Sequence, residues 1–288
     1  MMKQRYFLKK DNTKIFTEYE TYLRCEDRSE NTIRKYMRDL RAFYTFLGRA
    51  SLTKEAVLAW KRQLSESHAL SSANSMLAAV NSFLDWIGAP QCKVKPFRIQ
   101  REIFCKTEKE LTQEEYRRLV AAAEDHKNRR LALLLQTICA TGIRVSELCF
   151  ITAEALELGR ATVNCKGKQR VVFLPTELRR LLRRYCRDRR IDSGPIFCTK
   201  TGQPLDRSNI WKDMKALCAT AQVDPRKVFP HNLRHLFART YYRLEKDLSR
   251  LADLLGHTNI TTTRIYTAES GETHFQQMDR MGLVLSQT

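Results

Sequence analysis

The sequence lacks the hallmarks of a membrane protein and of a disulfide-stabilised protein. No apolar run approaches the length of a membrane span, and the basic start, residues 1–16, has no apolar signal core. The nine cysteines are an odd number, and no two of them form a CxxC pair. This usage argues against a disulfide framework and against a zinc module. We therefore expect a cytoplasmic protein with free thiols, most of them small core residues.

Motifs for common cofactors are also missing. The sequence has no GxxxxGK[ST], no GxGxxG, no HExxH and no internal repeat. His231 and His235 are four residues apart, as metal-binding pairs often are, but no third ligand or catalytic glutamate accompanies them. We expect no nucleotide, no metal and no other cofactor.

Basic residues are present in large excess. The 288 residues include 51 Lys and Arg against 32 Asp and Glu, a net charge of +19. Residues 1–104 hold 19 basic and 11 acidic residues, so this part and the remainder are both basic. A globular protein of this charge usually binds a polyanion, and no acidic tail offsets it. The length favours two domains.

The first part of the chain has the pattern of a compact helical domain. Apolar residues recur at helical spacing in four segments, 12–27, 29–47, 51–64 and 71–86. The second segment carries four basic residues on the side opposite its apolar stripe: Arg34, Lys35, Arg38 and Arg41. A solvated basic face explains them equally well on its own, but with the net charge we favour a helix that faces a DNA backbone.

The remaining chain predicts a basic linker and a second domain. We place a helical domain at 1–90, a linker at 91–107 and a mixed α/β domain at 108–288 with a tail at 268–288. A capping box at Thr112 and Glu115 starts one helix, and residues 128–140 form a nearly all-apolar one. Residues 154–174 predict a small β-meander with strands at 156–158, 161–165 and 170–174. Further helices are expected at 176–190, 208–221, 231–244, 248–255 and 259–266. The fold class is mainly α with this small β-meander.

The residues of 230–267 suit the handling of a phosphodiester. Arg234 offers a planar fork of donors to phosphate oxygens, and two imidazoles, His231 and His257, exchange protons near neutral pH. Tyr266 supplies a phenol that cationic neighbours could activate as a nucleophile. A single His-x-x-Arg pair is more often an ordinary solvated face. Arg144, just past a buried helix, with Glu147 three residues on, is alternatively a surface ion pair of little energetic worth.

Five segments together resemble the tyrosine recombinases, the phage integrase family. They are ATGIRVSEL (140–148), KGKQR (166–170), HNLRH (231–235), LLGHTNI (254–260) and TTTRIYT (261–267), in the family's order and spacing. The first part, notably NTIRKYMRDLRAFYTFLG (31–48), resembles the family's N-terminal helical core-binding domain. The resemblance implies a C-terminal catalytic domain of the same family and a site-specific DNA recombinase.

The resemblance also implies roles for individual residues. Arg144, Lys166, His231, Arg234, His257 and Tyr266 match the catalytic positions, and Glu147 matches the acid that supports Arg144. The hairpin is one residue shorter than the family's usual pattern, so Lys168 remains a rival to Lys166 as general acid and is otherwise a DNA contact. Tyr266 would attack a phosphate and leave a 3′-phosphotyrosine, which requires no cofactor.

The sequence also leaves two alternative functions open. One is a topoisomerase of type IB that only relaxes DNA, and another is a DNA-binding regulator without catalysis. The resemblance implies double-stranded DNA with specific sites as partner, and a homotetramer on it. We expect the apolar residues of the tail to bind a neighbouring subunit in trans. Integration, excision, inversion and resolution stay open as outcomes.

Overall fold

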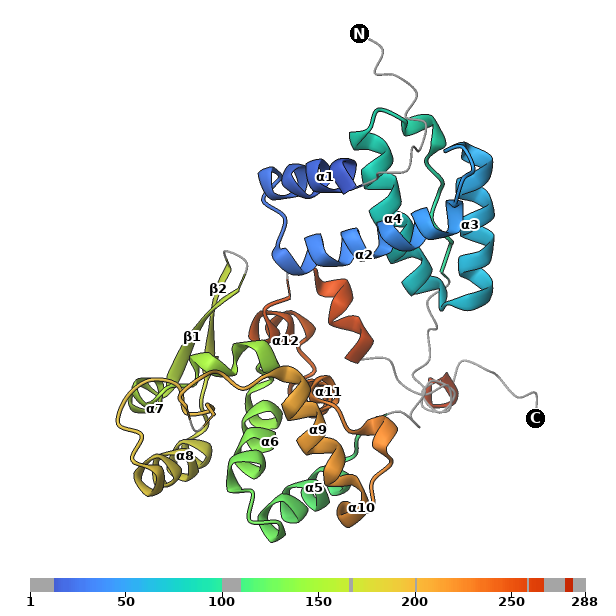
Figure 1. Cartoon of the computed structure of the whole chain (residues 1–288). Coiled ribbons are helices and arrows are strands. Elements are labelled where there is room, and N and C mark those ends of the chain that lie inside the picture. The colour runs from blue at the N-terminus through green and yellow to red at the C-terminus, as the bar shows by residue number, and fades with distance from the viewer. Residues whose placement is uncertain are drawn as a thin grey trace, which may run out of the picture. The chain divides into compact units, whose positions relative to one another are not determined.

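The computed structural model describes residues 13–99, 110–165, 168–199, 201–257, 259–266 and 278–281. The chain divides into two compact units, Met1–Arg101 and Glu102–Thr288. Both consist mainly of helices, and the sheet found in the described residues has two strands (Figure 1). No helix in these ranges is long and apolar enough to cross a bilayer. The predicted fold class is therefore confirmed.

The first unit is a bundle of helices around an aromatic core. Its helices are α1 (Thr13–Cys25), α2 (Glu30–Leu47), α3 (Lys54–Ser67) and α4 (Leu70–Trp86), followed by a 3₁₀ turn at Pro90–Cys92. Ser29 and Thr53 cap α2 and α3 because their hydroxyls accept from backbone N–H groups in the first turn. Tyr19, Phe43 and Phe83 are completely buried, and the Tyr19 and Phe83 rings meet edge to face at 5.1 Å.

The chain after α4 continues along the first unit. Asn81 exchanges two hydrogen bonds with the backbone of Val94, and Asn74 does the same with Phe97. Cys92 and Val94 are buried in the core of this unit. Part of the segment predicted as linker thus packs on α4 in the described residues.

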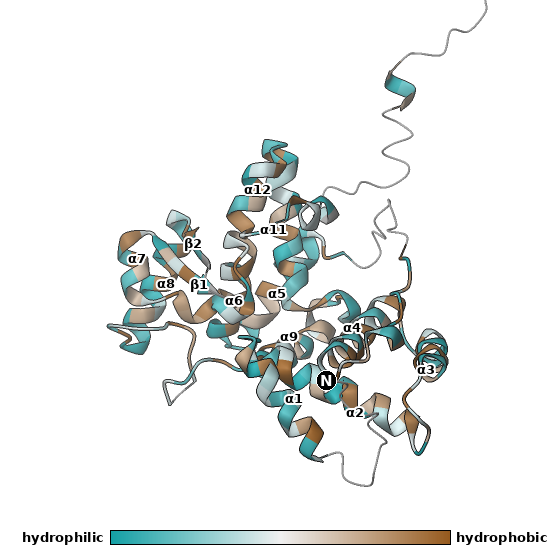
Figure 2. Cartoon of the chain, turned by 90° about the horizontal axis from the view of Figure 1, so that it is seen from above, coloured by the Kyte–Doolittle hydropathy of each residue, from teal (hydrophilic) through white to brown (hydrophobic). Residues whose placement is uncertain are grey.

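The second unit is built around the apolar helix α6. Its elements are α5 (Gln113–Asp125), α6 (Arg129–Thr141), a 3₁₀ helix (Val145–Phe150), α7 (Ala153–Leu158), β1 (Arg160–Cys165), β2 (Lys168–Phe173), α8 (Thr176–Arg189), α9 (Arg207–Ala216), α10 (Cys218–Ala221), a 3₁₀ turn (Pro225–Lys227), α11 (Pro230–Glu245), α12 (Leu248–Leu255) and 3₁₀ turns at Ile260–Thr262 and Arg264–Tyr266. Helix α6 has eight buried residues and packs against α5, α8, α9 and α11. In Figure 2 the helices carry hydrophobic and hydrophilic residues on different faces, as amphipathic packing requires. The predicted capping box of α5 at Thr112 and Glu115 is present.

Three local predictions are wrong. Residues 156–158, predicted as a strand, form the end of α7, because Thr152 caps this helix and Gly159 ends it in the left-handed conformation. The single helix predicted for 208–221 is divided at Leu217 into α9 and α10. The helix expected at 259–266 consists of two 3₁₀ turns.

Strands β1 and β2 form an antiparallel hairpin. Its register pairs Arg160 with Phe173 and Cys165 with Lys168. Val163 and Val172 are buried, and Phe173 is exposed, as alternation along a half-buried strand requires. The same alternation turns Arg170 toward the inner side, next to Val163 across the ladder.

Candidate active site

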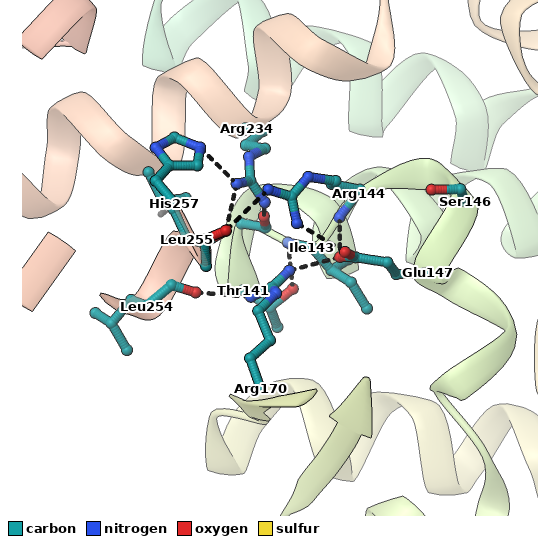
Figure 3. Close-up of polar contacts among 12 residues, drawn as sticks. Thr141, Ile143, Arg144, Ser146, Glu147, Arg170, Arg234, Leu254, Leu255 and His257 are labelled. Carbon is teal, nitrogen blue, oxygen red and sulfur yellow. Dashed lines mark hydrogen bonds and ion pairs between the residues drawn. The ribbon is translucent and has the colours of Figure 1, made fainter. Parts of the chain in front are cut away.

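Arg234 lies at the centre of the candidate site. It stands on α11 and is only 2% exposed. One of its terminal nitrogens donates to the carbonyl of Gly142, after the end of α6, and the other donates to the carbonyl of Leu255, at the end of α12, at 2.6 Å (Figure 3). Carbonyls at helix C-termini carry partial negative charge and so compensate a buried cation. Burial and then the charge of Arg144 lower the pKa of Arg234 to about 10, although Tyr266 acts to raise it through charge and a hydrogen bond.

Arg144 is held beside this buried arginine and remains open to solvent. It follows Gly142, whose left-handed conformation ends α6. The guanidinium donates to Glu147 Oε1 at 2.8 Å and to the carbonyl of Gly256 at 3.3 Å, and its side chain is 36% exposed. Arg144 can therefore reach an external anion without losing its support.

Glu147 is a buried carboxylate that organises two arginines. Oε2 accepts from the backbone N–H of Arg144 at 2.9 Å and from Arg170 at 2.5 Å. Burial acts to raise the pKa of Glu147, but the hydrogen bonds from Arg144 and the charge of Arg170 outweigh it, so the pKa lies below its ordinary value. This carboxyl is ionised at neutral pH and compensates part of the local positive charge.

Arg170 is a residue of the site that the sequence reasoning missed. It enters from β2, donates to the carbonyl of Leu254 at 2.7 Å and to Glu147, and its Nε is buried without a partner in the described part of the chain. Figure 3 shows its side chain reaching up from the strand toward Glu147 and Leu254. A signal was present in the sequence, because Arg170 occupies an inward position of an alternating strand, two residues before Val172.

His257 contacts Arg234 directly. Its Nε2 lies 3.0 Å from Nη2 of Arg234, and its Nδ1 lies 2.9 Å from the hydroxyl of Thr263. Burial, with the charges of Arg234 and Arg144, lowers the pKa of His257 to about 4. The imidazole is therefore neutral at physiological pH.

The two histidines of α11 are in contact with each other, and one of them contacts Tyr266. His231 is exposed in the first turn, and its ring meets the ring of His235 at 4.5 Å. Desolvation and the charges of Arg234 and Arg144 lower the pKa of His231. His235, which the sequence suggests only as half of a metal pair, meets the Tyr266 ring edge to face at 4.7 Å, and its Nε2 is buried without a partner among the described residues.

Tyr266 is buried within this group. It is 4% exposed, its ring stacks on that of His257 at 6.0 Å, and it has a hydrogen bond with Arg234. Its backbone N–H donates to the carbonyl of Thr263 at 3.0 Å. The phenol thus lies beside the guanidinium of Arg234 and the rings of His235 and His257.

The two lysines of the hairpin are the remaining predicted residues of the site. Lys166 lies outside the described residues. Lys168 begins β2, and its side chain also lies outside the described part of the chain. The structure therefore brings together Arg144, Glu147, His231, Arg234, His257 and Tyr266, and adds Arg170, His235 and Thr263 to them.

The basic residues predicted on α2 are only partly free. Arg34, Arg38 and Arg41 are exposed, whereas Lys35 is half-buried. Lys35 donates to the buried Asp39 at 2.6 Å and to the carbonyl of Ser75 at 3.1 Å, and Arg38 donates to Asp39 at 3.0 Å. Asp39, 1% exposed, thereby fixes two of the four cations in place.

The donor set of the site does not suit a metal. The described ranges contain no group of three or more His, Cys, Asp or Glu side chains placed to hold an ion. Guanidinium groups dominate instead, and these bind anions with several oxygens, such as phosphates. The arrangement combines two anion-binding arginines, neutral imidazoles and a phenol in one place.

Comparisons with known proteins match both parts of the chain. The sequence model of the Phage integrase family matches residues 109–272, and that of the "Phage integrase, N-terminal SAM-like domain" matches residues 16–89. The tyrosine recombinase XerA of Thermococcus kodakarensis is 30% identical, over 88% of this chain and 90% of its own. XerA of Pyrococcus furiosus is 28% identical over 94% and 95%. XerD of Halalkalibacterium halodurans is 29% identical over 83% and 87%.

Solved structures share the fold. The XerH site-specific recombinase bound to its difH substrate has a TM-score of 0.70 at 21% identity, covering 93% of this chain and 83% of that one. A lambda integrase tetramer bound to a Holliday junction has a TM-score of 0.69 at 20% identity, with 87% and 75% covered. The two family matches, the 30% identical relative and this shared fold agree with the resemblance seen in the sequence: the chain belongs to the phage integrase family of tyrosine recombinases.

Proposed function

We propose that this recombinase cleaves and rejoins double-stranded DNA at specific sites through a 3′-phosphotyrosine formed by Tyr266. The observation that supports this proposal most strongly is the burial of Arg234 against two helix C-termini, with Arg144, His257 and Tyr266 around it. Such a site can bind a phosphodiester and stabilise the charge that develops on it. The named relatives are recombinases, so a topoisomerase that only relaxes DNA and a non-catalytic regulator are not favoured.

Tyr266 is the proposed nucleophile. Its phenolate attacks phosphorus in line, the phosphorus–O5′ bond breaks, and the 5′-oxygen leaves with a proton from a general acid. Arg144 and Arg234 hold the non-bridging oxygens, and Glu147 supports Arg144. His231 is the proposed acceptor of the phenol proton, because its lowered pKa leaves the ring neutral and the ring meets that of His235, which in turn meets the Tyr266 ring. Attack by the 5′-hydroxyl of another strand on the phosphotyrosine then completes strand exchange.

Lys166, with Lys168 as rival, is the proposed general acid.

The two units have different roles in this proposal. The helical unit, residues 1–90, binds DNA through Arg34, Lys35, Arg38 and Arg41, the linker is 91–107, and 108–288 is the catalytic part. Because the proposed substrate is DNA, we place the protein in the cytoplasm. No metal or other cofactor takes part in these steps.

Assembly on DNA is proposed to involve four subunits and the tail. Exchange between two duplexes requires four strand cuts, and one structural neighbour is described as a tetramer on a Holliday junction. Met278 and Met281 are 69% and 60% exposed, so they are available to a neighbouring subunit. Phe275, Leu283 and Val284, the other apolar residues expected to act in trans, lie outside the described residues.

A suicide substrate tests the nucleophile. Duplexes that the protein selects from a random pool are given a nick beside the cleavage position, so that cleavage releases a short fragment and traps the covalent complex. Wild-type protein should form an adduct that survives a denaturing gel, whereas Tyr266→Phe should bind the same DNA without forming one. Tyr241→Phe and Tyr242→Phe, both on α11, are matched controls that should react normally. An adduct formed by Tyr266→Phe overturns the assignment.

A two-site plasmid separates the three functions. A recombinase yields recombined product, a relaxing enzyme yields relaxed circles only, and a regulator yields shifted but uncut DNA. Recombined product is the expected result.

A further inference from the structure

The two ring nitrogens of His257 have different partners, and these determine where its proton lies. Nε2 faces Nη2 of Arg234 at 3.0 Å, and a guanidinium only donates hydrogen bonds. Nε2 must therefore be unprotonated and accept. The ring is neutral, since its pKa is lowered to about 4, and its one proton is on Nδ1. Nδ1–H then donates to the hydroxyl oxygen of Thr263 at 2.9 Å.

Thr263 joins this histidine to the segment of the nucleophile. It is completely buried, with 0% exposure, between the two 3₁₀ turns that lead to Tyr266. Its carbonyl accepts from the backbone N–H of Tyr266 at 3.0 Å, and its own N–H donates to the carbonyl of Ile260 at 2.9 Å. Thr263 is thus bonded to His257 through its hydroxyl and to Tyr266 through its backbone carbonyl.

The tautomer with the proton on Nδ1 cannot assist a phosphate. A lone pair on Nε2 would repel an anionic oxygen, and only Nε2–H could donate to it. A phosphate that binds Arg234 would also take over the Nη2 hydrogen that Nε2 now accepts. The ring therefore has to exchange its proton, losing one from Nδ1 and gaining one at Nε2 through water, with no change in charge.

A threonine hydroxyl suits this exchange because it can both accept and donate. It accepts from Nδ1–H in the first tautomer and donates to Nδ1 in the second, so the buried nitrogen stays satisfied in both. A buried polar atom left without a partner is costly, and a side chain that only packs could not prevent this.

We propose that Thr263 is a positioning residue whose hydroxyl supports both tautomers of His257, and that His257 changes from acceptor toward Arg234 to donor toward the DNA phosphate. This inference rests on the proposed function, since it assumes that a phosphate binds between Arg144 and Arg234.

Nitrogen NMR tests the proposal without relying on activity. Protein labelled with ¹⁵N-histidine, in the Tyr266→Phe background, is measured alone and with its selected duplex, and the His257→Gln variant assigns the signal. Long-range ¹⁵N–¹H correlations distinguish Nδ1–H from Nε2–H. We expect Nδ1–H in the free protein and Nε2–H in the complex. Nε2–H in the free protein, or Nδ1–H in both states, overturns the proposal.

Cleavage by two nearly isosteric variants tests the role of the hydroxyl. Thr263→Ser keeps the hydroxyl and should form the adduct within about threefold of the wild-type rate. Thr263→Val keeps the shape and loses the hydroxyl, so it should be slower by about tenfold or more, the effect of one unsatisfied buried group. Equal rates for Ser and Val would mean that Thr263 only packs.

The outcomes also separate this inference from the proposed function. Adduct formation by Tyr266→Phe refutes the proposed nucleophile, and the absence of any adduct with the wild-type protein refutes the proposed cleavage, whereas equal Ser and Val rates with an inactive Tyr266→Phe refute only the role of Thr263. Urea denaturation checks that Thr263→Val is folded. If Thr263→Val is not folded, the nitrogen NMR measurement, which uses protein with intact Thr263, decides whether His257 changes its tautomer.

Discussion

Arg170 and Glu147 form a buried ion pair that joins the hairpin to the 3₁₀ helix after α6. Nη2 of Arg170 lies 2.5 Å from Oε2 of Glu147, with side-chain exposures of 11% and 2%. Because Glu147 also holds Arg144, and Arg170 also holds the carbonyl of Leu254, this pair connects three segments of the site. A displacement of the hairpin is thereby coupled to the anion-binding arginines.

Removing Glu147 should therefore lower the stability of the protein. Glu147→Ala leaves two arginines without their carboxylate and should lower the free energy of unfolding by about 3–5 kcal/mol, as expected for breaking a buried pair. The matched control is Glu157→Ala, which breaks an exposed pair with Arg183 and should cost about 0.2–1 kcal/mol. Urea denaturation measures both. Similar losses for the two variants would contradict a special role for Glu147.

The close approach of Gly256 and Arg170 gives a second prediction. Gly256 has φ +63°, and a Cβ there would overlap the side chain of Arg170. Gly256→Ala should push Arg170 away from Glu147 and Leu254, in addition to the backbone strain of about 1–2 kcal/mol. Gly202→Ala is the matched control: Gly202 has φ +78° but open space around it, so this substitution adds only the backbone strain. We expect the Gly256 variant to be the less stable of the two and to lose adduct formation, and equal behaviour would count against the importance of this approach.

Regular elements with strong local signals could be predicted from the sequence. The apolar stripes of α2 and α4, the capping box of α5 and the apolar helix α6 all appear where the periodicity places them. The error at 156–158 has a local cause: all six positions of the segment AEALEL carry strong helix formers, and this preference outweighs continuity with the neighbouring strands.

The candidate site was predictable only as far as motifs and chemical types allow. Arg234 could be recognised as an anion binder, but its burial against two helix ends depends on how α6, α11 and α12 meet. The sequence did not predict the roles of Arg170, His235 and Thr263, because these roles come from tertiary contacts, such as that of Thr263 with His257. Residue spacing alone does not contain such contacts.

Salt dependence tests the basic face of α2. Removing a side chain that neutralises one phosphate should reduce the slope of log affinity against log salt by about 0.9. We expect this change for Arg41→Gln, which removes an exposed charge on α2. Arg62→Gln removes an exposed charge on α3 and serves as the control, with an unchanged slope. The opposite ranking would move the DNA-binding face to α3.

Stability should fall in mild acid because of two half-buried histidines, His235 and His257. The folded-state pKa values of His235 and His257 are about 4, below the ordinary value of 6.5. The unfolded chain therefore binds protons first as the pH falls, so the stabilisation is complete above about pH 6.5 and is lost between about pH 6.5 and 4. Urea midpoints across this range measure it. The His235→Gln, His257→Gln double variant should show a flatter profile, and an equally steep one would contradict the origin in these two rings.

The two hairpin lysines can be distinguished by the leaving group. If Lys166 is the general acid, Lys166→Ala should slow adduct formation by about 10²–10⁴-fold on normal DNA. A substrate with sulfur at the 5′-bridging position should largely restore the rate, because a thiolate leaves without a proton. Lys168→Ala is the matched control two residues away: it should keep most of the rate on normal DNA and gain nothing from sulfur. Rescue of Lys168→Ala instead, with Lys166→Ala unaffected, would assign the proton transfer to the first residue of β2.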